Sequence, residues 1–548
     1  MSDTAFQMVA IALYFVLMLA IGFYAFRRTS DLDDYMLGGR KLTPPVAALS
    51  AGASDMSGWL LLGVPGAIYA SGLVESWIVI GLVIGAWLNW KFIAPRLRAY
   101  TEIANNSITV PSFFENRLRD KSHVLRIAAG TIILVFFTFY VSSGMVAGGV
   151  FFETSFGSTY LVGMLLVAGV TLCYTLFGGF LGASLTDVAQ ALLMFAALVT
   201  IPVVTIIATG GPGEMINLVQ DADAAHNAAN PGDEIHRTSL FFGGSFLAIV
   251  SAAAWGLGYF GQPQIIVRFM AMRSAADAKA GRRIGISWMV LTSVGAITTG
   301  FAGLAYFFRD GVTLDNPETV FLQLAQVMFH PFVAGVVLAA VLAAIMSTIS
   351  SQLIVCSSAL VEDIYRAFGR EASPKRLVTY GRLGVLTVAV VAVLLALNPD
   401  GTILDLVGFA WAGFGAAFGP LIILSLFWRK LTSAGAIAGM IAGAVVVGIW
   451  GQTEALSSTM YEIVPGFLAC LVVAVAVSLV TAREDEEIQR EFTDMAEKAQ
   501  GPRRQPDAKL SRAGRRGTTR SPARTAAHAK SPPERAGTCR PGSPGRRR

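Results

Sequence analysis

An acid and two hydroxyls lie in the middle of a long apolar stretch near the N-terminus. Residues 44–69 are long and apolar enough to cross a bilayer, and they contain Ser54, Asp55 and Ser57. A charged carboxylate at the centre of a membrane costs about 2.5–3.5 kcal/mol on insertion scales, so a chain keeps one where it has a partner. No Lys or Arg lies within this stretch. The partner of Asp55 is therefore distant in the sequence or is not protein.

Two glycines lie three residues to either side of this acid. Gly52 and Gly58 weaken the helix around Asp55. An unwound segment exposes backbone carbonyls, which is how membrane proteins build sites for dehydrated cations. We therefore expect a cation site at this break. The simpler alternative is that Asp55 only hydrogen-bonds to a neighbouring helix.

A second group of hydroxyls lies in the ninth apolar stretch of the chain. Ala344, Ser347 and Thr348 stand at i, i+3 and i+4, so they share one helical face. Ser and Thr in membrane helices often bond only to their own backbone, and this alternative stays open for each of them. Together with unwound carbonyls near Ala53 and Met56, the two hydroxyls would form an oxygen cage for a small, hard cation.

A second interrupted helix is expected at residues 255–263, which read Trp-Gly-Leu-Gly-Tyr-Phe-Gly-Gln-Pro. Glycines and a proline at this density do not hold a regular helix. Trp255 and Tyr259 are four residues apart and can share a face before the break. Tyr140 lies centrally in another apolar stretch, where its buried hydroxyl needs a partner. Taken alone, Tyr140 is better explained by core packing.

The elements that position these residues are membrane helices. Of the 548 residues, 54% are hydrophobic and 14% are charged, whereas soluble domains are about 25% charged. Apolar stretches of about 20 residues recur along the chain, which indicates an all-α polytopic membrane protein. We predict about thirteen spans, at residues 5–26, 44–70, 75–94, 124–152, 160–181, 186–208, 239–262, 284–308, 319–358, 379–397, 402–428, 434–451 and 461–481.

Basic residues are distributed asymmetrically between the two sides of these spans. With the N-terminus outside, only Arg237 and Arg309 of the 42 Lys and Arg residues fall in outer segments. Because basic residues mark the cytoplasmic side, the C-terminus is predicted in the cytoplasm. The sequence thus predicts a multi-pass protein of the plasma (inner) membrane.

The two interrupted helices are the second and seventh spans, five spans apart. This spacing is typical of a five-plus-five inverted repeat, with a binding site at mid-membrane between the breaks. The predicted divisions are 1–43 for the first helix and a cytoplasmic loop, 44–430 for the inverted-repeat transport core, 431–481 for two accessory helices and 482–548 for a disordered basic tail.

The C-terminal tail differs from the rest of the chain in charge. Residues 501–548 carry 14 Lys and Arg against Asp507 and Glu534, a net charge of +12. Since the whole chain carries +6, the remainder carries −6. The tail's composition forms no core, and attraction to anionic lipid of the inner leaflet explains its charge. The high isoelectric point is therefore no sign of nucleic-acid binding.

The sequence contains none of the catalytic motifs that would indicate an enzyme. The five histidines form no HExxH pattern and the four cysteines form no CxxC pair. No motif for a nucleophile or a bound cofactor is present either. We expect a protein that is not an enzyme.

Five motifs resemble the sodium:solute symporter family. They are Asp-Asp-Tyr-Met-Leu-Gly-Gly-Arg at 33–40, Ser-Ala-Gly-Ala-Ser-Asp-Met-Ser-Gly-Trp-Leu at 50–60, the second break at 255–263, Met-Ser-Thr at 346–348 and Trp-Ala-Gly-Phe-Gly-Ala-Ala-Phe-Gly-Pro at 411–420. The resemblance covers about residues 1–480 and leaves out the basic tail. It implies an inverted-repeat fold, alternating access and sodium-coupled symport of L-proline.

The resemblance also implies roles for individual residues. It assigns sodium, the co-transported ion, to Ala53, Asp55, Met56, Ala344, Ser347 and Thr348. It assigns proline to Ser57, Gly58, Tyr140, Trp255, Tyr259 and Pro263. Arg40 and Asp187 match positions that the family uses in coupling or gating. From the residues alone, Arg40 is equally a solvated charge. The residues favour a helix-terminus role for Asp187 in the predicted turn 178–187, with a functional cation contact as the alternative.

Proline suits these residues because it is a compact zwitterion with an apolar ring. Aromatic faces can hold the ring and the ammonium group, and backbone N–H groups at a broken helix can hold the carboxylate. Two other functions stay open. One is sodium symport of another small solute of the same family, and the other is a sensor built on a transporter-like membrane domain.

Overall fold

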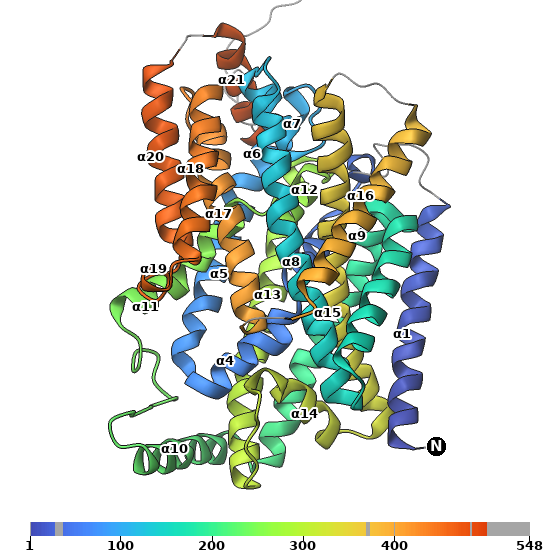
Figure 1. The fold of residues 1–548 in the computed structure, drawn as a ribbon, viewed down its shortest axis with the longest axis vertical. Coiled ribbons are helices and arrows are strands. Elements are labelled where there is room, and N and C mark those ends of the chain that lie inside the picture. The colour runs from blue at the N-terminus through green and yellow to red at the C-terminus, as the bar shows by residue number, and fades with distance from the viewer. Residues whose placement is uncertain (1, 28–36, 369–372, 399–400, 483–484, 501–548) are drawn as a thin grey trace, which may run out of the picture. The chain divides into compact units, whose positions relative to one another are not determined.

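The computed structural model describes residues 2–27, 37–368, 373–398, 401–482 and 485–500. Half of the motif at 33–40 and the whole of 501–548 lie outside these residues, so the predictions made for them are not addressed by the structure. The described helices belong to one unit, Met1–Gly501, and Figure 1 shows how they run side by side.

Within the described residues, ten helices are long and apolar enough to cross a bilayer. The longest, α9 (Tyr160–Ala208), contains Gly179 with φ 57° and ψ −160°, which divides it into two arms. These two arms and the two interrupted helices complete the thirteen predicted crossings. The other crossing helices are α1 (Asp3–Phe26), the run Leu73–Ile103 that contains α5 (Ser76–Leu88), α8 (Val124–Phe156), α13 (Ala278–Arg309), α15 (Pro331–Ser358), α16 (Pro374–Leu395), α17 (Ile403–Phe427), α18 (Ser433–Gly451) and α20 (Ile463–Val480).

The first interrupted helix consists of α3 (Pro44–Asp55), a π-helical turn (Trp59–Gly63) and α4 (Val64–Ser71). The second consists of α11 (Phe246–Ala253), a 3-10 segment (Ala254–Phe260) and α12 (Pro263–Met270). The predicted span 239–262 is therefore wrong at both ends. Ser245 accepts a hydrogen bond from the backbone of Ala248 and starts the helix later, and Pro263 begins a second helical half rather than ending the span.

Two other predicted segments differ from the structure. The expected turn 178–187 is helical apart from the single reversal at Gly179, so Asp187 lies inside a helix and caps none. The expected span 319–358 is two helices, α14 (Val320–Met328) and α15, because Pro331 starts a new helix after an extended residue, Phe329.

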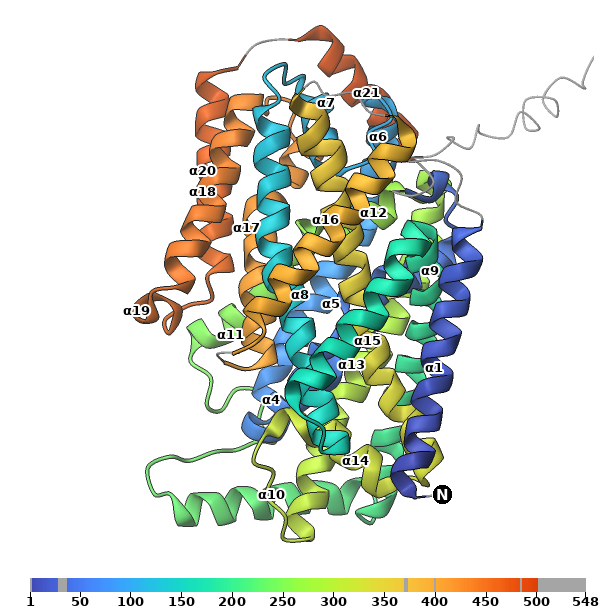
Figure 2. The same cartoon turned by 45° about the vertical axis from the view of Figure 1, so that its right-hand side comes forward.

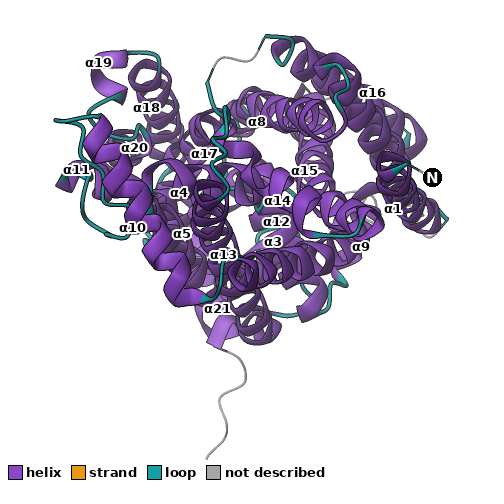
Figure 3. Cartoon of the chain, turned by 90° about the horizontal axis from the view of Figure 1, so that it is seen from below, coloured by secondary structure: helices purple, strands orange, loops and turns teal. Residues whose placement is uncertain are grey.

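α15 is the central column of the fold. Every residue from Val337 to Ser358 is buried, and Figure 3 shows α15 surrounded by other helices, with α3 and α12 near it. α1, α16, α18 and α20 lie at the edge in the same view. α1 buries only one stripe, including Tyr14 and Met18, and exposes apolar side chains such as Leu13, as a helix facing lipid does.

Glycines bring the second interrupted helix into backbone contact with its neighbours. A Cβ on Gly81 or Gly85 of α5 would lie 2.1 Å from the carbonyl oxygens of Ala253 and Gly256, respectively. On another side, a Cβ on Gly258 would lie 1.9 Å from the indole nitrogen of Trp411 in α17. No side chain fits at these positions, so the 3-10 segment is held between α5 and α17.

Short helices cover the two ends of the unit. α10 (Pro212–Ala229) and α14 lie at the same end as the N-terminus of α1 in Figures 1 and 2. α6 (Ala94–Ile103), α7 (Val110–Leu118) and α21 (Glu486–Gln500) lie at the opposite end. We call these the α10 end and the α21 end.

α21 corrects the predicted boundary of the tail, which placed residues 482–548 without structure. Its N-terminus is capped by Asp485, whose carboxylate accepts the backbone N–H groups of Glu487 and Ile488 at 3.0 and 3.2 Å. Phe492 and Met495 form a buried apolar face. The average composition of the tail hid this short amphipathic segment because basic residues beyond it dominate.

Candidate functional site

The first break separates α3 from the π-helical turn at Met56 and Ser57. Met56 has φ −81° and ψ 81°, which ends α3 after its N–H donates to Gly52. Both glycines near the break are packing positions: a Cβ on Gly52 would lie 2.7 Å from the ring of Trp288, and one on Gly58 would lie 3.1 Å from Ala147. The break therefore forms where neighbouring helices approach closely.

Side chains from distant helices satisfy the backbone around the second break. Trp411 Nε1 donates to the Trp255 carbonyl at 2.7 Å, and Asn89 Nδ2 donates to the Tyr259 carbonyl at 2.8 Å. Gln262 Nε2 donates to the Trp411 carbonyl at 3.1 Å. Buried carbonyls released from a helix need such donors, so the break is part of the folded structure.

Four of the residues assigned to sodium meet through their oxygens. Ser347 Oγ lies 2.7 Å from the Ala53 carbonyl oxygen and 3.0 Å from that of Ala344. Thr348 Oγ1 lies 3.4 Å from the same Ala53 oxygen. α3 and α15 come from opposite repeats, so these oxygens join the two halves of the core. Carbonyl and hydroxyl oxygens are ligands that a small, hard cation takes.

The other two residues assigned to sodium, Met56 and Asp55, make other contacts than this oxygen cluster. Met56 is buried, and its thioether lies 3.7 Å from the Thr292 hydroxyl, so its side chain adds no oxygen. Asp55 is buried and accepts a short hydrogen bond from the Tyr259 hydroxyl on Oδ2, whereas Oδ1 accepts none within the described residues. Asp55 therefore joins the first break to the second rather than pairing with a basic residue.

Aromatic side chains gather around the two breaks. The Trp59 indole donates to the Asp55 carbonyl at 3.0 Å, and the Tyr140 hydroxyl lies 3.5 Å from the same oxygen. Tyr259 meets Trp411 edge to face, with ring centroids 5.3 Å apart. Four of the substrate candidates, Ser57, Gly58, Tyr140 and Tyr259, thus lie at or against Asp55 and the first break.

Trp255 lies in a stack that sequence reasoning did not find. Its ring packs against Tyr461 at 5.3 Å and against Trp411 at 6.4 Å, in both cases nearly parallel. The Tyr461 hydroxyl donates to the Gly408 carbonyl at 2.6 Å. Tyr461 precedes α20, an accessory helix, so no local pattern connected it with this site. Pro263 is buried as the first residue of α12 and shapes the break itself.

Arg40 and Asp187, the two gating candidates, lie in separate networks. Arg40 donates to Thr101 Oγ1 at 3.1 Å, to the Met270 carbonyl at 2.9 Å and to the Ser107 carbonyl at 2.7 Å. Close by, Leu42 pairs with Met272 in an isolated bridge. These contacts tie the start of α3 and the end of α12 to α6 at the α21 end.

Asp187 is fully buried and pairs with Arg268, a residue that the sequence analysis placed in a cytoplasmic segment. Arg268 Nη2 lies 3.0 Å from Asp187 Oδ2 and 2.5 Å from Ser351 Oγ. Ser50 Oγ donates to the same carboxylate at 2.7 Å and accepts from Arg268 Nε at 3.0 Å. Four helices, α3, α9, α12 and α15, thus meet at one buried ion pair, one turn from Ala53 and Ser347.

A further buried acid joins two elements at the α10 end. Glu318, just before α14, accepts the backbone N–H groups of Ile403 and Leu404 at 3.2 and 3.4 Å. A Cβ on Gly66 of α4 would lie 2.7 Å from the Glu318 Cα. Burial raises the pKa of Glu318, and the two N–H donors oppose that rise. The first turn of α17 and the first interrupted helix therefore meet at this carboxylate.

Comparison with known proteins shows the family to which the chain is similar. The model of the sodium:solute symporter family matches residues 35–443. The chain is 54% identical over 478 residues to the high-affinity proline transporter PutP of Bacillus subtilis, covering 87% of this chain and 98% of that protein. It is 48% identical over 493 residues to the sodium/proline symporter of Escherichia coli, covering 89% and 96%.

A second Bacillus subtilis protein, the osmoregulated proline transporter OpuE, is 51% identical over 486 residues, covering 88% of this chain and 96% of that one. Among solved structures, a Na⁺-coupled sialic acid symporter in a substrate-bound, outward-open state aligns with a TM-score of 0.72. That alignment covers 87% of this chain and 98% of the other at 18% identity, so it bears on the fold alone.

Proposed function

The chain belongs to the sodium:solute symporter family, and from that membership we propose that it takes up L-proline together with sodium by alternating access. The fold is the inverted-repeat transporter fold, and sodium is the coupling ion. The relatives that share about half of its residues are named for proline transport. The observation that carries the proposal is the oxygen cluster of Ala53, Ser347 and Thr348 between the two repeats.

In the proposed mechanism, sodium binds among the Ala53 and Ala344 carbonyls and the Ser347 and Thr348 hydroxyls. Met56 contributes its backbone at the break. The Asp55 carboxylate supplies negative charge nearby, which favours the cation without a fixed positive partner. Because the ligands come from α3 of one repeat and α15 of the other, bound sodium stabilises the arrangement in which these two helices are in contact.

Proline binds beside the first break, next to the sodium. Ser57, Gly58 and neighbouring backbone N–H groups face its carboxylate, and the hydroxyls of Tyr140 and Tyr259 orient groups around Asp55. Trp255, in its stack with Tyr461, offers an apolar face to the pyrrolidine ring. Pro263 fixes the geometry of the second break.

Gating follows from the two networks at the α21 end. Arg40 holds α3 and α12 against α6, and the Asp187–Arg268 pair closes the path one turn from the sodium oxygens. Both must rearrange before the site opens at that end. Proton or group-transfer chemistry has no part in this cycle, and we propose a transporter that is not an enzyme.

The protein lies in the plasma (inner) membrane, with the N-terminus outside and the α21 end in the cytoplasm. The support is the placement of nearly all Lys and Arg on the α21 side. The basic residues beyond Gln500 then face anionic lipid of the inner leaflet rather than nucleic acid.

Counterflow of labelled L-proline in proteoliposomes tests the function. Uptake is expected in sodium buffer and near background in choline buffer, with other amino acids competing weakly. Equal uptake in the two buffers would contradict sodium coupling. Uptake of a different solute with the same sodium dependence would favour the second family function, and ligand binding without transport would favour the sensor.

Trp255→Ala is expected to weaken proline binding about tenfold or more while changing the sodium dependence less. The ring stacks on Tyr461, whereas the sodium oxygens lie on α3 and α15. Trp87→Ala, which removes an exposed indole from α5, is the matched control. The measurement is the half-saturation concentration of proline and of sodium in each variant. A selective loss of sodium affinity would show that Trp255 is misassigned.

Truncation after Gln500 is expected to leave sodium-driven uptake per inserted molecule unchanged. The removed residues have the composition of a chain without a core, and lipid can neutralise their charge. Uptake normalised to membrane abundance is the measurement. A large loss at equal abundance would mean that the tail takes part in transport.

A further inference from the structure

The helix α21 packs on the cytoplasmic end of the core through two apolar anchors. Phe492 and Met495 are buried, and the Phe492 ring meets Tyr100 of α6 edge to face at 6.3 Å. Two guanidinium groups approach the same ring, Arg117 at 5.7 Å and Arg429 at 5.0 Å. α21 therefore joins α6, α7 and the segment after α17.

Arg117 shows how tightly this helix covers the surface. Its side chain is fully buried, lies 5.1 Å from the Tyr100 ring, and donates from Nε to the Ser425 carbonyl at 3.3 Å. Its two terminal nitrogens have no hydrogen-bond partner among the described residues. The aromatic rings of Tyr100 and Phe492 take the place of such partners, as cation–π contacts do. Without α21, this charge would be open to water.

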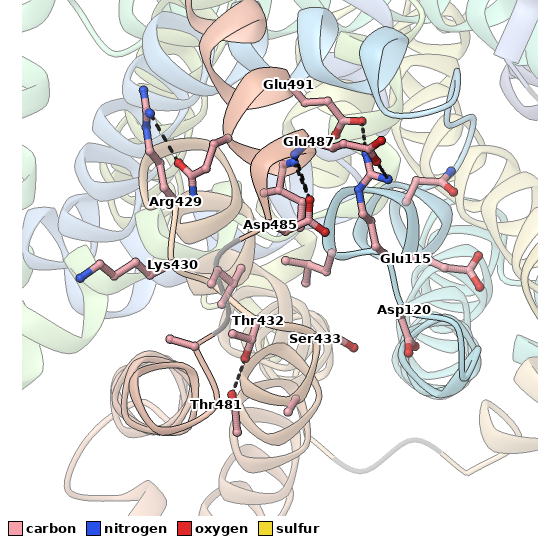
Figure 4. Close-up of a pocket in the computed structure, with 18 of the residues that line it drawn as sticks. Glu115, Asp120, Arg429, Lys430, Thr432, Ser433, Thr481, Asp485, Glu487 and Glu491 are labelled. Carbon is pink, nitrogen blue, oxygen red and sulfur yellow. Dashed lines mark hydrogen bonds and ion pairs between the residues drawn. The ribbon is translucent and has the colours of Figure 1, made fainter.

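Ion pairs surround the apolar anchors. Arg119, which follows α7, pairs with Glu487 and, at 2.9 Å, with Glu491. Lys498 pairs with Glu102 of α6 at 2.8 Å. Figure 4 shows Glu487 and Glu491 close together on α21, each joined to the neighbouring element by a dashed line. Burial raises the pKa of Glu491 despite the two nearby arginines. These pairs fix the orientation of α21 on both neighbours.

The other face of α6 contacts the start of α3 and the end of α12, and we call these contacts the inner closure. Thr101 accepts from Arg40, and Arg98 donates to the Met272 carbonyl at 2.5 Å. α6 is thus bound to the start of α3 and the end of α12 on one face and to α21 on the other. Through α21, this group is joined to α7 and to Arg429 after α17.

We propose that α21 is an intramolecular clamp that restrains opening of the cytoplasmic side. While α21 is docked, the group formed by α6, the start of α3 and the end of α12 is held to α7 and α17. When α21 leaves, fewer contacts oppose opening, and the inward-open population rises. Those that remain include the Arg40, Arg98 and Arg268 networks and the hydrogen bond from Arg96 of α6 to the Leu426 carbonyl. The clamp requires that the site opens alternately, but it does not depend on which solute is carried.

Labelling of a buried cysteine at the inner closure tests the clamp. Ala271→Cys is placed at the fully buried end of α12, in a background with Cys173, Cys356, Cys470 and Cys539 replaced by serine. A water-soluble maleimide reports its exposure in the purified protein. Deleting residues 482–548 is expected to speed labelling about tenfold, whereas deleting 501–548 leaves the rate unchanged. Phe492→Ala is expected to raise the rate in the same direction.

Two controls separate the clamp from general loosening. Arg490→Ala removes an exposed side chain of α21 that pairs only within the helix, with Glu486, and is expected to change nothing. Ala392→Cys, buried in α16, replaces the reporter and is expected to label slowly in every variant. If the larger deletion does not fold, Phe492→Ala carries the test. Equal labelling of Ala271→Cys with and without α21, or equal acceleration at both reporters, would overturn the clamp.

Discussion

Arg268→Met is expected to reduce sodium-driven proline uptake to near background. The substitution removes the positive partner of Asp187, which is fully buried, and leaves Ser50 and Ser351 without the donor that organises them. Removing one partner of a buried ion pair costs about 3–5 kcal/mol, because the remaining charge is uncompensated. This is the largest effect we expect from any single side chain of the core.

The double variant Asp187→Asn with Arg268→Met distinguishes folding from coupling. Without an isolated charge, it is expected to recover membrane abundance, since replacing both members of a buried pair is often nearly neutral for stability. Transport should stay impaired because four helices lose their common contact. Arg283→Met, an exposed arginine at the start of α13, is the control. Wild-type uptake and sodium half-saturation in Arg268→Met would show that the pair has no role in the cycle.

Ser347→Ala and Thr348→Ala are each expected to raise the sodium concentration needed for half-maximal uptake. Each removes one oxygen from the cluster on Ala53 and leaves the carbonyls in place. Leaving a buried group unsatisfied costs about 1–3 kcal/mol, which corresponds to roughly ten- to hundredfold weaker sodium binding. The effect should shrink when sodium is saturating.

Two variants of the same helix make this test specific. Thr348→Ser keeps the hydroxyl and is expected to recover most of the sodium affinity. Ser358→Ala removes a buried hydroxyl that bonds only to the Val355 carbonyl of its own helix, so sodium dependence should not change. If both Ser347→Ala and Thr348→Ala keep the normal half-saturation concentration, the sodium site has been assigned to the wrong helix.

The features that could be predicted from the sequence are those that local chemistry determines. The lengths of the apolar stretches predict the thirteen crossings, and the glycines and the proline near Trp255 predict the second break. The asymmetry of Lys and Arg predicts a cytoplasmic C-terminus, which stays a prediction. The i, i+3, i+4 spacing of Ala344, Ser347 and Thr348 put their oxygens on one face, which α15 presents to Ala53.

The remaining features depend on partners that are distant in the sequence. Arg268 looked like a loop charge because its acid, Asp187, is 81 residues away on another helix. Tyr461 stacks on Trp255 across a separation more than twice as long. The docking of α21 depends on Tyr100 and Arg117, and no periodicity within residues 486–500 identifies that surface. Gly52 and Gly58 were interpreted as weak points, although packing against Trp288 and Ala147 occupies both.

The backbone contact between α5 and the 3-10 segment has a mechanical consequence. Gly81 and Gly85 leave no layer of side chains that could slide or change rotamer between the two elements, and Asn89 is hydrogen-bonded to the Tyr259 carbonyl at their shared end. Two surfaces in such contact cannot roll over each other without separating. We therefore expect α5 and the second interrupted helix to move as one lever. Because α6 continues the chain of α5 beyond Ile93, a rotation of that lever at mid-membrane is carried directly to the α21 end.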